Sequence, residues 1–201
     1  MLAVCGALTL SACASKYAQV PARLDLEPYG RVALVAFSTE QTHDELSTLA
    51  TQRFAEALLA SQSGVELLEL GITDSSLGGG AASADPAALA QALGREKDVP
   101  AVFVGHLKVS GVQPRGSIGG AGNVNVRASV NAELTVRLLS TRTGATVWRS
   151  SAAANGTVGQ VALSARRPSI AVRDPDEAYG EVLNALVTSV TRDLRPTWVK
   201  Q

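Results

Sequence analysis

The sequence predicts an α/β fold in two or three layers, in which a mixed sheet of order β-α-β-α-β is followed by a long antiparallel β-hairpin and a C-terminal helix. Three observations predict this class. A short and nearly continuous apolar run from Arg31 to Phe37 is typical of a strand buried on both faces. Apolar residues between Leu46 and Leu58 recur at helical spacing. Between Val124 and Leu138, apolar or small residues alternate strictly with polar ones, which indicates a long strand with one buried face.

The first helix and the second strand are bounded by local signals. Thr42-His43-Asp44-Glu45 matches a capping box, which predicts that a helix begins there and continues to about Ser61. Gly64 ends this helix, because glycine readily adopts the left-handed conformation found just past a helix end. The apolar segment 65–70 then forms the second strand.

The second helix is short, and proline marks the strand that follows it. Asp85 is a predicted N-cap, and Pro86 suits the first helical position. Gly94 is predicted to close the helix. Pro100 precedes the third strand, residues 101–109, which is apolar at first and half-exposed later.

The hairpin extends from Asn123 to Val158 and turns within residues 140–144. A three-residue loop of 142–144, with Gly144 in the left-handed conformation, fixes the register. That register predicts three facing pairs: Thr141 with Ala145, Leu138 with Trp148, and Arg137 with Arg149. Trp148 is therefore expected on the buried face. Beyond Ser150 the second arm is rich in alanine, so its far end is expected to fray or to be covered.

A glycine-rich segment, residues 113–122, precedes the hairpin and is predicted to be a loop. A phosphate-binding loop would need a helix N-terminus behind it, and here a strand follows, so a plain strand connection is the favoured interpretation. We take this loop as a candidate interaction segment, and its candidate residues are Arg115, Gly116, Ile118, Gly119 and Gly120.

The chain after the hairpin begins with a basic segment, residues 159–173, which is predicted to be irregular. Asp174-Pro175 opens the last helix, where acidic residues in the first turn favour the helix dipole. An apolar stripe continues to Leu194, and Arg195-Pro196 stops the helix.

The N-terminus indicates export and lipidation. Residues 1–12 are apolar or small and carry no charge, as in a secretory signal peptide. Leu10-Ser11-Ala12-Cys13 resembles a bacterial lipobox, which implies cleavage before Cys13 and acylation of its thiol and amine, with palmitate among the acyl chains. The alternative is an ordinary signal peptide with an incidental cysteine. Ala14 follows the cysteine, and by resemblance to lipoprotein sorting rules this implies the outer membrane.

The predicted domain organisation follows from these features. Residues 1–12 are the signal peptide, residues 13–29 are a lipid-anchored tether without periodicity, and residues 30–201 form one periplasmic α/β domain. Cys5 leaves with the signal peptide, so the mature chain has no thiol besides Cys13.

Composition and spacing argue against several functional classes. The formal net charge is zero and aromatic residues make up 4% of the chain, which disfavours binding to nucleic acids. His43 and His106 are the two histidines, and neither has a cysteine or carboxylate at ligand spacing, so we expect no metal and no cofactor. The acidic residues at helix starts are explained as caps, and no motif indicates a catalytic residue.

Taken with the lipobox, these elements resemble a family of bacterial periplasmic lipoproteins. The resemblance is carried by four segments: Gly30–Phe37, Leu46–Leu59, Val102–Gly105, and the turn Thr141–Gly144 that leads to Val147-Trp148. They look like the group containing the curli secretion channel CsgG, the penicillin-binding-protein activator LpoB and the polysaccharide-export lipoprotein PelC, and the first half is similar to the N-terminal domain of TolB. The resemblance covers roughly Gly30 to Leu194. It implies an α/β domain with a mixed sheet, no enzyme activity, and work through protein assembly.

Two hypotheses for function follow. In the first, the protein is a non-enzymatic lipoprotein of the outer membrane that acts in envelope assembly or export through contacts with envelope proteins or with copies of itself. In the second, it is a periplasmic lipoprotein that binds a small ligand or a glycan. Open α/β sheets bind ligands at the carboxyl ends of their strands, which lie here near residues 38–42 and 71–85.

Overall fold

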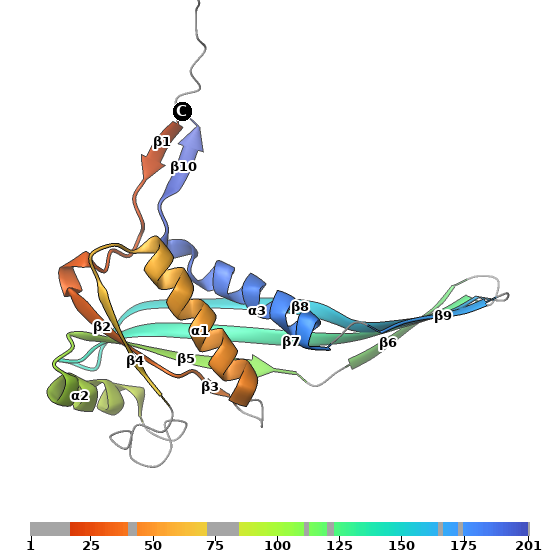
Figure 1. Cartoon of the computed structure of the whole chain (residues 1–201), viewed down its shortest axis with the longest axis horizontal. Helices are drawn as coiled ribbons and strands as arrows, with labels where there is room; N and C mark the ends of the chain where they lie inside the picture. Colours follow the sequence, from red (N-terminus) through yellow and green to blue (C-terminus); the bar gives the residue numbers. More distant parts are fainter. Residues whose placement is uncertain are drawn as a thin grey trace, which may run out of the picture.

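The fold is organised around a mixed sheet of eight strands, part of which continues as a long ribbon (Figure 1). The computed structural model describes residues 17–39, 44–71, 85–110, 113–119, 123–164, 167–172 and 175–200. The strands are β2 (Arg31–Val35), β3 (Ser38–Thr39), β4 (Glu66–Leu70), β5 (Ala101–Val109), β6 (Gln113–Gly119), β7 (Asn123–Ser140), β8 (Thr146–Ser164) and β9 (Arg167–Val172). Their order is β4-β2-β5-β7-β8-β9, with β3 paired to β5 and β6 paired to β7. Pairing is parallel among β2, β4 and β5 and antiparallel from β5 to β9, so the predicted mixed sheet is confirmed.

Helices cover the two faces of the sheet unequally. Helices α1 (Asp44–Ser61) and α3 (Pro175–Val190) pack on one face, and α2 (Pro86–Lys97) packs on the other. Side chains alternate between these faces, so that Val32 and Leu34 face α1 while Ala33 and Val35 face α2. The fold therefore has three layers where α2 packs and two layers where only α1 and α3 cover the sheet, so both predicted arrangements occur in different parts of the sheet.

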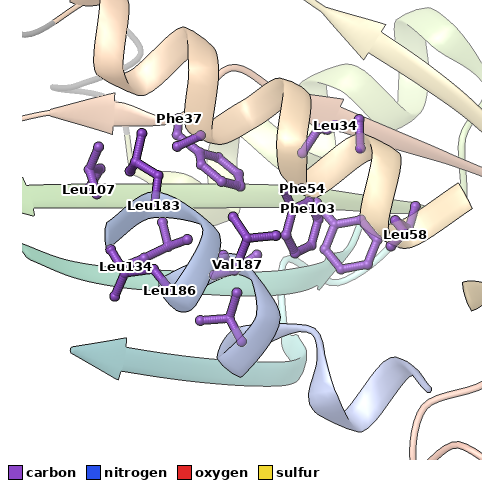
Figure 2. Packing of buried hydrophobic residues seen from close by; sticks show 14 of the residues in the cluster. Leu34, Phe37, Phe54, Leu58, Phe103, Leu107, Leu134, Leu183, Leu186 and Val187 are labelled. Carbon is purple, nitrogen blue, oxygen red and sulfur yellow. The ribbon is translucent and has the colours of Figure 1, made fainter. Parts of the chain in front are cut away.

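The larger core lies between the sheet and the pair α1 and α3 (Figure 2). The rings of Phe37, Phe54 and Phe103 pack in sequence with centroids 5.4 Å apart. Trp148 extends this row and meets Phe103 edge to face at 6.1 Å. Strand β7 contributes every second side chain to this core, namely Val130, Ala132, Leu134, Val136 and Leu138. The stripe predicted on the last helix is also buried: Val182, Leu183, Leu186, Val187, Val190 and Leu194.

Helix α2 begins where the sequence predicts but ends later. The Asp85 side chain caps it by accepting a hydrogen bond from a first-turn N–H at 3.1 Å. The prediction that Gly94 closes the helix is wrong, because α2 continues to Lys97 and Asp98 takes the left-handed conformation, with φ of 52°. Gly94 serves a packing role instead, since a Cβ at this position would lie 2.3 Å from the Cβ of Thr141.

The hairpin has the predicted register over the part that carries the core. Leu138 faces Trp148, and Arg137 faces Arg149. Gly144 has φ of 73°, as its predicted left-handed role requires. Of the two outcomes predicted for the alanine-rich part of the second arm, fraying or being covered, the structure shows the second. β8 stays paired with β7 as far as Leu163, and Ala152 and Ala154 pack against the larger core. Pairing with β7 along its whole length outweighs the weak strand propensity of the alanine-rich segment.

The turn itself differs from the predicted three-residue loop. Leu139 faces Thr146, and the predicted pairing of Thr141 with Ala145 is absent from the register. The backbone N–H of Thr141 instead donates to the carbonyl of Pro100 at 3.1 Å, and its hydroxyl donates to the carbonyl of Val99 at 2.6 Å. These bonds tie the turn to the start of β5, which accounts for the shift.

Two segments predicted to be irregular are strands. Part of the glycine-rich segment forms β6, which pairs with the first residues of β7, and part of the basic segment forms β9, which pairs with the end of β8. The sequences of β6 and β9 do not alternate between apolar and polar residues, so the sequence gives no sign of a strand. Both strands are recognised only from their hydrogen-bonded pairing with β7 and β8. The end of the ribbon is consequently four-stranded, in the order β6-β7-β8-β9.

The first and the last described strands form a separate two-stranded ribbon. Strand β1 (Tyr17–Val20) pairs antiparallel with β10 (Thr197–Lys200). A 3₁₀ turn, η1 (Glu27–Tyr29), follows β1, and another, η4 (Arg192–Leu194), precedes β10. The structure differs here from the predicted tether of residues 13–29, because Leu26 is fully buried in the larger core. None of the helices in the described ranges combines the length and the apolar character needed to cross a membrane.

Candidate functional site

The candidate interaction segment lies on the projecting ribbon, which we call the arm: β6, residues 123–129 of β7, residues 157–164 of β8, and β9. The arm extends beyond the ends of α1 and α3 (Figure 1). Four of the candidate residues lie in β6, where Arg115 is opposite Arg127, Gly116 opposite Val126, Ile118 opposite Val124 and Gly119 opposite Asn123. Gly120 lies outside the described residues. The predicted loop is thus an outer strand of the arm.

The length of the arm follows from the two long strands. β7 has 18 residues and β8 has 19, so at about 3.3 Å per residue each spans roughly 60 Å. A register shift between Ala128 and Ser129 of β7 marks the point where the arm leaves the helix-covered sheet. Before that point, residues 146–157 of β8 border β7 and no other strand among those that the structure describes. These residues therefore form an unpaired sheet edge, with Val147 47% exposed.

Beyond α2 the second face of the sheet has no helix over it in the described ranges, and we call this surface the open face. It carries alternate residues of three strands: His106 and Lys108 of β5; Asn131, Glu133, Thr135 and Arg137 of β7; and Arg149, Ser151, Ala153 and Asn155 of β8. All of them are exposed or half-buried. Their polar character explains why no helix packs on this part of the face.

Two arginines oppose one another on the open face. Arg137 and Arg149 are directly paired across β7 and β8, and like charges in such a pair are destabilising. No ion pair or hydrogen bond joins either guanidinium to another described residue. Glu133, on the same strand as Arg137, faces Lys108 and Ala153 in the register. The arginine pair is therefore a local concentration of positive charge on a chain of zero net charge.

A small cavity adjoins Arg137, between the open face and the start of α2. It measures about 80 Å³, and its lining includes Ser38, Pro86, His106 and Arg137. It lies at the carboxyl ends of the parallel strands, where the sequence predicts a crevice, although residues 40–43 and 72–84 of that region lie outside the described residues. The sequence predicts the position of the cavity but not that His106 and Arg137 line it. These two residues lie on β5 and β7, far in sequence from the segments 38–42 and 71–85 in which the crevice is expected.

The chemistry of this cavity centres on Ser38 and His106. The Ser38 hydroxyl lies 2.9 Å from Nδ1 of His106 and 3.3 Å from the carbonyl oxygen of Gly105. When the hydroxyl donates to that carbonyl, it accepts from the Nδ1–H of His106, so the imidazole does not take the serine proton. The pair then acts as a polar link between β3 and β5.

Cys13, the predicted lipidation site, lies outside the described parts of the chain. His43, for which the sequence predicts no ligand role, also lies outside them. Within the described residues, no group of three or more histidine, cysteine, aspartate or glutamate side chains could hold a metal ion.

Comparison with known proteins shows similarity at the level of solved structures. No protein-family model and no curated protein matches the sequence. A PelC dodecamer from Paraburkholderia phytofirmans is 18% identical and covers 90% of this chain and 96% of its own, with a TM-score of 0.45. The C-terminal domain of LpoB from Escherichia coli is 18% identical and covers 62% and 82%, with a TM-score of 0.36. A minor lipoprotein from Acinetobacter baumannii is 15% identical and covers 83% and 93%, with a TM-score of 0.33.

Proposed function

We propose that the protein is a non-enzymatic lipoprotein, anchored in the outer membrane through Cys13, that acts in envelope assembly or export by binding other envelope proteins or copies of itself. The observation that carries this proposal is the arm together with the unpaired edge of β8 beside it. A four-stranded ribbon that leaves the helix-covered core adds surface without adding core. Such a surface serves to contact another macromolecule.

Unpaired strand edges are the specific means of contact. A strand edge presents unpaired N–H and C=O groups that another chain can pair with. Residues 146–157 of β8 offer such an edge, and β4 is the edge strand at the other end of the sheet order. Pairing of one edge with the other, between copies, would continue the sheet from subunit to subunit in a heterologous contact.

Light scattering and cross-linking test the proposal. We expect lipidated protein in detergent, and the Cys13→Ser protein without detergent, to form a species larger than a monomer or to cross-link to an envelope protein. In the Cys13→Ser background, Thr157→Cys places the single mature thiol at an exposed position of β8, and Thr188→Cys places it on the exposed side of α3. A cross-linker that carries one maleimide and one succinimidyl ester joins this thiol to a lysine amine of a neighbouring protein. Added to cells, it should give a defined larger product from Thr157→Cys and less from Thr188→Cys. Monomeric protein at high concentration, with equal or no cross-linking at both positions, would refute the proposal.

A second candidate function is the binding of an anionic ligand, such as a phosphorylated or uronic-acid-containing glycan, on the open face. The unpaired Arg137 and Arg149 favour it, because guanidinium groups bind carboxylates and phosphates in bidentate fashion. Thermal unfolding with and without peptidoglycan fragments and acidic glycans tests it. We expect stabilisation that is lost in Arg137→Gln and Arg149→Gln, while a shift equal in all three proteins, or none, would reject it.

A further inference from the structure

The ribbon formed by β1 and β10 carries most of the large apolar side chains that are exposed in the described residues. Six large apolar side chains are exposed in the described residues, and four of them lie on this ribbon: Tyr17, Val20, Trp198 and Val199. Trp198 is 65% exposed and Tyr17 is 57% exposed. A cluster of exposed apolar side chains on one short ribbon indicates a surface that contacts a membrane or another molecule.

The two aromatic residues share one face of the ribbon. Tyr17 is opposite Lys200, and Gln19 is opposite Trp198, so these four side chains lie on the same side of an antiparallel pair. That face has two amphipathic aromatic rings, one amide and one cation. Tryptophan and tyrosine are enriched at the boundary between lipid and water, and lysine keeps its ammonium in water while its stem covers apolar surface.

The position of the ribbon relative to the predicted anchor identifies its partner. Tyr17 lies four residues after Cys13, and four residues span at most about 14 Å of extended chain. Acyl chains on Cys13 would therefore hold Tyr17 close to the membrane surface. Figure 1 shows the ribbon projecting away from the sheet and the helices, so the body of the protein does not block this approach.

The backbone of the ribbon limits how deep it can lie. β1 and β10 pair with one another, and each leaves its outer edge without a strand in the described residues. Unpaired backbone groups are costly in hydrocarbon and are satisfied by water at the interface. An isolated two-stranded ribbon is also only marginally stable in water, so contact with a surface along one face would stabilise it.

From these observations we propose that the face of Tyr17, Gln19, Trp198 and Lys200 docks on the lipid surface, with both aromatic rings at the level of the headgroups. The proposal rests on the proposed lipidation of Cys13, which brings the ribbon to the bilayer. The ribbon would then be a second membrane contact that fixes the orientation of the domain relative to the acyl anchor.

Tryptophan fluorescence tests the proposal, because the chain has two tryptophans. In the lipidated Trp148→Phe protein, Trp198 is the sole tryptophan, and we expect shorter-wavelength emission and quenching by brominated acyl chains in phosphatidylethanolamine–phosphatidylglycerol vesicles. The matched control is Trp198→Tyr, in which the core residue Trp148 should not be quenched by brominated lipid.

The outcomes separate this inference from the proposed anchor. Mass spectrometry of Cys13 reports acylation independently of the fluorescence, so a missing acyl group would refute the anchor. In that case, the fluorescence of Cys13→Ser protein mixed with vesicles would still show whether the ribbon contacts lipid. If acylated protein is bound to vesicles and Trp198 is neither shifted nor quenched, the inference is overturned while the anchor stands. A shift without lipid quenching that grows with protein concentration would mean that a second copy covers the ribbon, and this also overturns the inference.

Discussion

At the scale of single residues, one close approach fixes how α2 sits against the hairpin. Gly94 and Thr141 come from distant parts of the chain, and the Thr141 hydroxyl is already bonded to the carbonyl of Val99. Any side chain at position 94 would press on a residue held in this way. The absence of a Cβ therefore matters here for packing, and the backbone conformation at this position is ordinary helix.

We predict that Gly94→Ala is destabilising although alanine is the better helix former. The added Cβ would lie 2.3 Å from Thr141 Cβ and 2.8 Å from its Oγ1, and overpacking of this kind costs about 1–3 kcal/mol. Gly180→Ala in α3 is the matched control, because its Cβ would meet nothing closer than Arg53 Nη2 at 3.7 Å. There we expect a gain of about 0.5–1 kcal/mol from helix propensity. Urea unfolding measures the change in the free energy of unfolding for each variant. If both variants were stabilised, or both destabilised, the packing argument would be contradicted.

Trp148 presents a second residue-scale feature. Its indole N–H is buried without a hydrogen-bond partner among the described residues. We predict that Trp148→Phe changes the unfolding free energy by less than about 1.5 kcal/mol, because losing ring volume is offset by removing an unsatisfied donor. Trp148→Ala should cost about 3–5 kcal/mol through the cavity it leaves beside Phe103. Thermal and urea unfolding distinguish the two, and a large loss in Trp148→Phe would show that the indole N–H is satisfied.

At the scale of elements, Gln62 joins three parts of the chain just past the end of α1. Its Oε1 accepts from the N–H of Leu26 at 2.9 Å, and its Nε2 donates to the carbonyls of Leu24 at 3.1 Å and Leu194 at 2.6 Å. One amide therefore satisfies backbone groups of the segment before η1 and of the end of η4. The same contacts position the base of the ribbon formed by β1 and β10.

We predict that Gln62→Met destabilises the protein by about 1–3 kcal/mol, because buried backbone groups lose their partners while the side-chain volume is kept. Gln52→Met, at an exposed position of α1, should be close to neutral. Hydrogen exchange should quicken at the amide of Leu26 in Gln62→Met and stay unchanged in Gln52→Met. If exchange there does not respond, Gln62 does not hold this segment.

At the scale of the whole molecule, the ribbon of β1 and β10, which follows the predicted anchor in sequence, and the proposed contact surfaces lie in different places. The ribbon of β1 and β10 pairs the first and the last described strands, and the arm leaves the domain in another direction (Figure 1). An anchored domain can thus rest at the membrane while its arm extends away from the anchoring point. This geometry is compatible with lateral contacts between copies as well as with contacts to a partner.

Membrane attachment is predicted to depend on Cys13. The Cys13→Ser protein should lose acylation and shift from the membrane to the soluble periplasmic fraction, or accumulate as uncleaved precursor. Each buried methylene of an acyl chain contributes about 0.8 kcal/mol and stable anchoring takes more than one chain, so the ribbon contact alone should be reversible. Fractionation with a carbonate or high-salt wash measures this. Processed Cys13→Ser protein that stays in the washed pellet would mean that another segment or a bound partner holds it.

The sequence by itself determined the elements whose signals are local. Alternation in β7, helical spacing in α1 and α3, and the Asp85 cap are each contained in a few consecutive residues, and the structure has these elements where the sequence predicts them, with one difference. The last helix, predicted to continue to Leu194, ends at Val190, and residues 192–194 form the 3₁₀ turn η4. The opposition of Arg137 and Arg149 was predicted from a three-residue turn. The observed turn is different, and the register shift between Leu138 and Leu139 restores the predicted pairing.

Only the tertiary structure decided the features that depend on residues far apart in sequence. Strands β6, β9 and β10 lack periodicity of their own and form because a neighbouring strand offers unpaired backbone groups. Gly94 packs against a turn, although its identity suggested a helix end. The cavity, the unpaired edge of β8 and the aromatic face of the terminal ribbon likewise arise from contacts between distant segments. Propensity is a weak preference of up to about 1 kcal/mol per residue, so such contacts override it.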